Sequence, residues 1–181
     1  GSDQHGGFVR RYNMKSYDLY NHRTIDGFNN VSAIDMHGTF AAGEVQNGPK
    51  RQAGTAYLDD EGARSSIMEY SHMAAKRIIE LNDSQKAVLY FVEPENQAQT
   101  RYSLIAFHDE EGRVCNTYRL GKAGAENILA YSGTYSEGRL MISGARALES
   151  DKSNPSLQKN RYFTYTPYGM AIDLNGLKTC S

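Results

Sequence analysis

The clearest periodic pattern in the chain covers residues 63–81. Its apolar residues recur three and four positions apart: Ile67, Tyr70, Ala74, Ile78 and Leu81. This is the spacing of an amphipathic helix. The acidic run before it favours a helix start, because the helix dipole attracts negative charge there. The pattern therefore predicts one long helix over residues 63–81.

Short apolar runs of strand length follow the predicted helix. They cover residues 87–92, 100–108, 113–120, 128–134, 139–145, 161–166 and 170–174. Turn-forming residues separate them at hairpin spacing, including the segments at 109–112, 135–138 and 166–169. The segments at 109–112 and 135–138 carry Gly in the last position, as type I turns prefer. This half of the chain is predicted to be an antiparallel meander.

The first part of the chain is less regular. Residues 29–45 alternate between two faces until Gly38 interrupts them, which predicts one bent strand. An Asn-Gly-Pro turn at 47–49 precedes a further strand near residue 54. Residues 8–20 mix aromatic and charged side chains with no steady period, so an edge strand and a short helix are both open there.

Together these patterns predict an α+β fold. We expect a curved or partly closed antiparallel sheet of seven to nine strands, with the helix at 63–81 packed on one face. A parallel sheet is disfavoured, because one helix cannot supply the crossovers that parallel strands need. Residues 1–7 are expected to be a tag remnant and disordered lead, and residues 8–181 a single domain.

Composition supports a folded domain and argues against two classes of partner. The chain has 181 residues, of which 39% are hydrophobic and 23% charged, so it can bury a substantial core. Its 20 Lys and Arg balance 21 Asp and Glu without forming a basic run, which disfavours nucleic-acid binding. No apolar run reaches the length of a membrane span.

Several features favour an exported protein. The start Gly1-Ser2 resembles the remnant of tag cleavage, and a signal sequence or membrane anchor is a segment commonly removed from such chains. Cys115 and Cys180 are the two cysteines of the chain. The second lies one residue from the end of the sequence, which suits a disulfide that fastens a terminal segment. The alternative is a reactive thiol at Cys115.

Candidate catalytic residues are few and form no known motif. Asp35 and His37 share one face of the predicted strand, and His108 and Asp109 adjoin a turn. Either pair could act as acid and base, with Cys115 as a nucleophile. The commoner role of such residues is structural. The His and Cys spacing matches no metal motif, and no nucleotide-binding motif is present, so we expect no metal and no cofactor.

Tyrosines offer a candidate binding surface. Tyr162, Tyr165 and Tyr168 lie close together in sequence, and Tyr135 occupies a turn. Such side chains can stack on a ligand or anchor a protein, although cross-strand pairing within a sheet is their commoner role. The polar loop at 149–160 is a further candidate contact.

Two hypotheses about function follow. The first is a non-catalytic, exported binding domain that contacts a protein or a small ligand through its sheet face, an edge strand or the loop at 149–160. The second is a small hydrolase or transferase that uses one of the His/Asp pairs with or without Cys115. A disulfide at Cys115 favours the first, because a bridged sulfur is not a nucleophile.

Overall fold

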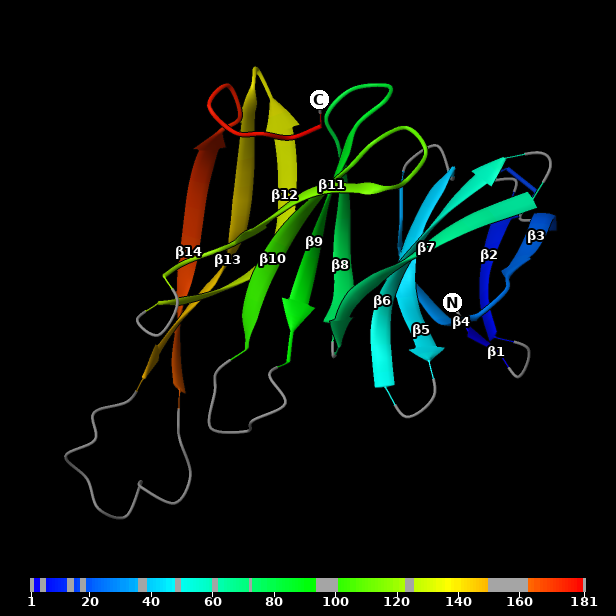
Figure 1. Ribbon diagram of the computed structural model, residues 1–181, viewed down its shortest axis with the longest axis horizontal. Coiled ribbons are helices and arrows are strands. Elements are labelled where there is room, and N and C mark those ends of the chain that lie inside the picture. The colour runs from blue at the N-terminus through cyan, green and yellow to red at the C-terminus, as the bar shows by residue number, and fades with distance from the viewer. Residues whose placement is uncertain are drawn as a thin grey trace, which may run out of the picture.

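The computed structural model describes residues 2–3, 6–12, 15–16, 19–35, 39–47, 50–59, 62–71, 73–93, 101–122, 126–149 and 163–180. Within these ranges every regular element is a β-strand (Figure 1). The prediction of an α+β fold is therefore wrong. In place of a helix at 63–81 the chain forms β7 (Gly62–Ser71) and β8 (Met73–Glu80). No helix capable of crossing a membrane occurs in the described part of the chain.

The described strands form four antiparallel sheets. Sheet 1 contains β1 (Ser2–Asp3), β2 (Gly6–Tyr12) and β3 (Leu19–Ile25). Sheet 2 contains β4 (Phe28–Ile34), β5 (Phe40–Asn47), β6 (Lys50–Asp59) and β7. Sheet 3 has the order β11 (Val114–Arg119), β10 (Tyr102–His108), β9 (Lys86–Val92), β8. Sheet 4 contains β12 (Asn127–Ser136), β13 (Arg139–Glu149) and β14 (Phe163–Asp173).

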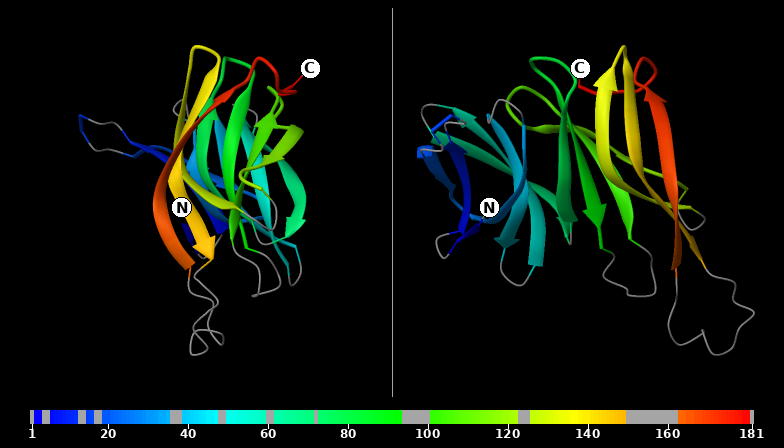
Figure 2. Two further views of the ribbon diagram at one scale, coloured as in Figure 1. Left: turned by 90° about the vertical axis from the view of Figure 1, so that its left-hand side faces the viewer. Right: turned by 180° about the vertical axis from the view of Figure 1, so that it is seen from behind.

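The central strands of sheet 3, β9 and β10, are buried on both faces. Figures 1 and 2 show the four sheets following one another along the long axis of the molecule. Val88 and Tyr90 of β9 pack toward Phe40 of sheet 2, whereas Ala87 and Leu89 pack toward β12 and β13 of sheet 4. A strand covered on both sides loses its polar alternation. This explains the continuous apolar runs of β9 and β10.

A β-bulge explains why β8 resembles a helix in the sequence. The strand buries Met73, Ala75 and Ile78 on one face, and the register with β9 shifts between Ala75 and Arg77. The extra residue changes the spacing of buried positions from two to three. Ile79 is also buried, but on the opposite face. The buried residues Ala75, Ile78 and Ile79 are therefore three and four positions apart, which is the spacing of a helix.

The strand pairing tests several further expectations. Residues 29–45 were expected to form one bent strand, but β4 and β5 pair as an antiparallel hairpin; Gly38 lies outside the described residues. The predicted turn at 166–169 is instead part of β14, which pairs with β13 without interruption. The turn at 109–112 is present as predicted, with Gly112 at a φ of 78°, a conformation that glycine adopts readily. The turn predicted at 135–138 lies further along the chain, because Tyr135 and Ser136 still pair with β13 and the chain reverses at Glu137 and Gly138, with φ of 50° and 77°.

Candidate binding site

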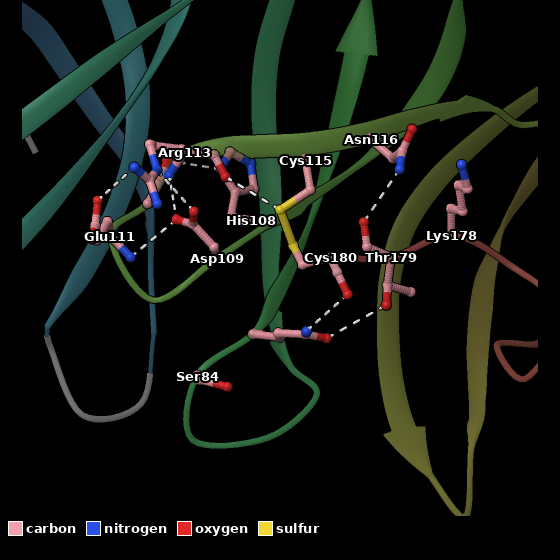
Figure 3. Close-up of a disulfide and its surroundings, with 12 residues drawn as sticks. Ser84, His108, Asp109, Glu111, Arg113, Cys115, Asn116, Lys178, Thr179 and Cys180 are labelled. Atoms are coloured by element: carbon pink, nitrogen blue, oxygen red, sulfur yellow. Dashed lines mark hydrogen bonds and ion pairs between the residues drawn. A yellow bond between two sulfur atoms is a disulfide. The ribbon is translucent and has the colours of Figure 1, made fainter.

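The C-terminal segment is fastened across β11. Cys115 of β11 is bonded to Cys180, which confirms the predicted disulfide (Figure 3). Around the bridge, Asn116 Nδ2 donates to the Thr179 carbonyl at 3.4 Å, and the Tyr118 hydroxyl donates to the Lys178 carbonyl at 2.9 Å. While the bridge is intact, the sulfur of Cys115 has no thiolate to offer as a nucleophile.

Asp35 anchors the beginning of β5. Its Oδ1 accepts hydrogen bonds from the backbone N–H groups of Thr39 (2.7 Å) and Phe40 (3.0 Å). Its Oδ2 accepts one from the Thr39 hydroxyl at 2.9 Å and lies 3.6 Å from Nζ of Lys86. The Asp35 side chain is fully buried. A carboxylate in this position needs both the hydrogen bonds and the cation to offset its desolvation.

His108 lies in the same buried region. Lys86 and His108 are register partners on β9 and β10, and the His108 ring packs edge-on against Phe40 with centroids 5.4 Å apart. Nδ1 lies 3.1 Å from the Gly112 carbonyl. Since a carbonyl only accepts, Nδ1 carries the proton. Nε2 is buried with no hydrogen-bond partner among the described residues. Burial lowers the pKa of His108 to about 4.

Asp109 directs its hydrogen bonds to the turn that follows it, and its effect on the His108 ring is limited to a minor electrostatic one that raises the pKa of His108. Its Oδ2 accepts a hydrogen bond from Nε of Arg113 at 2.9 Å, and its Oδ1 accepts from the N–H groups of Glu111 and Arg113. Partial burial would raise the pKa of Asp109, but the contacts with Arg113 outweigh it and hold that pKa below its ordinary value. Asp109 thus stabilises the turn at 109–112.

A groove of about 390 Å³ lies where three strands from different sheets meet. Its lining residues come from the end of β4, the second half of β8 and the middle of β12: Ile34, Arg77, Ile78, Ile79, Glu80, Gly133, Thr134 and Tyr135. The volume is at the small end of the range for ligand sites, roughly 300–1,000 Å³. The groove has mixed polar and apolar walls and one exposed cation, Arg77.

The groove and the buried polar cluster adjoin each other. Ile34, in the groove wall, directly precedes Asp35. Glu80, also in the wall, is the register partner of Lys86. A ligand in the groove would therefore contact the end of β4, next to the place where the Asp35–Lys86 ion pair ties it to β9.

The sequence-based candidates are distributed over several places. Asp35 and His108 meet in one cluster, although the sequence paired each of them with a neighbour instead. Tyr135 lines the groove. Tyr165 is exposed on β14, and Tyr168 is half-buried against sheet 4's core. His37, Tyr162 and residues 150–160 of the predicted loop lie outside the described residues.

Two residues escaped the sequence reasoning. Lys86 directly precedes the apolar run at 87–92, where a polar residue is expected at the boundary of a strand. Nothing in the sequence showed that its side chain is buried. Arg77 falls within residues 63–81, which were predicted to be a helix and are β7 and β8 instead. Among the described residues, no group of three or more His, Cys, Asp or Glu side chains is arranged to hold a metal ion.

No protein-family model matches the chain, and no curated protein is significantly similar to it.

Proposed function

We propose that this chain is a binding domain of an exported protein and that its ligand occupies the groove between β4, β8 and β12. The observation that carries the proposal is the groove itself, which combines the apolar side chains of Ile34 and Tyr135 with the exposed guanidinium of Arg77. Binding sites are typically concave and apolar, with a few polar groups that orient the ligand.

The disulfide supports the assignment to an oxidising compartment. Cytosolic proteins keep their thiols reduced, whereas exported proteins retain structural disulfides. The bridge between Cys115 and Cys180 fastens the chain end to β11, as expected of a staple. Alkylation of intact native cells before lysis tests this point. We expect both cysteines to resist labelling until a reductant is added, and labelling of both without reductant would contradict export.

The groove can be tested by NMR with ¹⁵N-labelled protein and a set of small fragments that includes carboxylates, sugars and aromatic amines. We expect chemical-shift changes at the amides of Arg77, Glu80 and Tyr135. Substituting Thr134→Tyr should fill the groove and abolish these changes. The matched control is Ser132→Tyr, because Ser132 is also exposed on β12 but does not line the groove. Shift changes confined to other surfaces would overturn the assignment of the site.

A further inference from the structure

The groove is lined by one edge of β8. In sheet 3, β8 is the last strand, and β9 is its one ladder partner among the strands that the structure describes. β4 and β12 lie beside β8, yet each belongs to another sheet. The earlier part of the edge is capped, because the Ser32 hydroxyl donates to the Ala75 carbonyl at 3.0 Å. The groove begins two residues further on, at Arg77.

The register shows which backbone groups face the groove. The N–H of Leu81 donates to the Gln85 carbonyl at 3.0 Å, so Leu81 turns its backbone toward β9. In an antiparallel pair, successive residues of a strand direct their N–H and C=O groups to opposite sides. The uninterrupted register from Arg77 to Glu80 therefore directs the backbone groups of Ile78 and Glu80 away from β9, toward the groove.

Two cations lie on the β12 side of this edge. Arg77 is the register partner of Leu89, whose side chain packs toward sheet 4. Nζ of Lys76 stands over the Phe91 ring, 4.7 Å from its centroid. No ion pair of Arg77 is present among the described residues, whereas Glu80 has an interaction of its own. The charge left for a ligand is thus the Arg77 guanidinium, which binds carboxylates with two parallel hydrogen bonds.

The dimensions fit a short strand. Four residues of β8, Arg77 to Glu80, line the groove, which at about 3.3 Å per residue gives roughly 13 Å of edge. Ile34 is 41% exposed and Tyr135 is half-buried, so both can contact apolar side chains of an added strand. Added strands bind in this way, through main-chain hydrogen bonds and pockets for alternate side chains.

We propose that the groove binds an extended peptide segment of three or four residues that adds to the edge of β8 and places a carboxylate on Arg77. This inference rests on the proposed function, since it names the ligand of the same groove. The backbone groups of Ile78 provide the main-chain contacts, Ile34 and Tyr135 contact the apolar side chains, and Arg77 selects an acidic segment.

The test uses four probes titrated into ¹⁵N-labelled protein. They are acetyl-Val-Thr-Val-Glu-amide, the same peptide with Gln in place of Glu, a version of the first with N-methylated backbone amides, and benzoate. We expect the first peptide to shift the Ile78 and Glu80 amides. The Gln peptide and the N-methylated peptide should each bind at least about tenfold more weakly, since each loses one set of hydrogen bonds. The variant Arg77→Gln should weaken the Glu peptide by the same factor. Arg101→Gln should leave its affinity unchanged, because Arg101 pairs with Glu93 away from the groove.

Other results of these titrations would each contradict a specific part of the proposal. Equal binding of the N-methylated peptide or of benzoate, mapped to the groove, would overturn strand addition while leaving a small-molecule site in place. Equal binding of the Glu and Gln peptides would overturn the role of Arg77. If no peptide shifts the groove at millimolar concentration, the inference is wrong. The fragment titration then decides separately whether the groove is a binding site.

Discussion

Lys86 and His108 are opposite each other on β9 and β10, and each contacts sheet 2 in a different way. Lys86 reaches Asp35 by an ion pair of 3.6 Å, and His108 packs its ring on Phe40. The Phe40 N–H donates to the same Asp35 carboxylate. In addition, the Gly112 carbonyl accepts from the Thr55 hydroxyl of β6 at 3.3 Å. Two sheets are therefore joined by one buried polar cluster whose charges must stay balanced.

Acid should lower the stability of the protein by protonating His108 in this buried polar cluster. Its folded pKa of about 4 lies below the unfolded value of 6.5, so the unfolded chain binds a proton first as the pH falls. Stability contributed by neutral His108 is complete above pH 6.5 and is lost as the pH falls from 6.5 to 4. The loss is up to about 3 kcal/mol, at 1.36 kcal/mol per pKa unit. Urea unfolding at several pH values in this window measures it.

The matched control for this pH effect is His108→Gln. Gln does not titrate, and its side-chain amide can still donate to the Gly112 carbonyl. The difference in unfolding free energy between the two proteins should depend on pH between 6.5 and 4. A difference that is constant across the window would contradict the role of His108, whatever the other titrating groups do.

Removing the cation of the buried ion pair should be costly. Lys86→Met leaves the fully buried Asp35 carboxylate without its counter-charge, so we expect a loss of roughly 3 kcal/mol or more in unfolding free energy. Lys122→Met, at an exposed position, should change it by less than about 0.5 kcal/mol. Thermal and urea denaturation provide the measurement.

A double variant distinguishes the contribution of the ion pair to stability from the other effects of substituting two buried residues. Asp35→Asn with Lys86→Met removes both charges and retains an oxygen for the N–H groups of Thr39 and Phe40. It should be more stable than the sum of the single losses predicts. Additive losses would show that the two side chains are not coupled.

Loss of the disulfide should destabilise the whole domain. The bridge closes a loop with a sequence separation of 65, for which the chain-entropy relation gives about 4 kcal/mol. We expect the Cys115→Ser, Cys180→Ser double variant to lose stability of this order and to match the reduced wild-type protein in urea unfolding. Retention of full stability after reduction would show that the contacts of Asn116 and Tyr118 suffice to hold the terminus.

Two glycines opposite bulges should not tolerate a side chain. A Cβ at Gly43 would meet the Asn30 carbonyl of β4, and one at Gly144 would meet the Leu129 carbonyl of β12. Because both obstacles are backbone, Gly43→Ala and Gly144→Ala should each cost about 3 kcal/mol. Gly176→Ala is the control, since no atom lies within 4 Å of a Cβ there; its unfolding midpoint should stay close to that of the wild type.

The sequence by itself determined much of the local structure. The apolar runs of β9 and β10 and the glycine-ended turn at 109–112 are local signals, because strand propensity and positive φ depend on adjacent residues. The position of Cys180 likewise favoured a disulfide with Cys115, although a reactive thiol at Cys115 was the open alternative until the structure showed the bridge. These features do not require knowledge of what covers each face.

Only the tertiary structure decided the rest. The bulge between Ala75 and Arg77 is a property of pairing with β9, and without that partner the spacing of β8 is indistinguishable from a helix. The ion pair of Asp35 with Lys86 joins residues from separate sheets. The groove exists because β4, β8 and β12 meet without forming one sheet. Burial on two faces and contact between distant segments depend on how sheets stack, and no local pattern of residues encodes that arrangement.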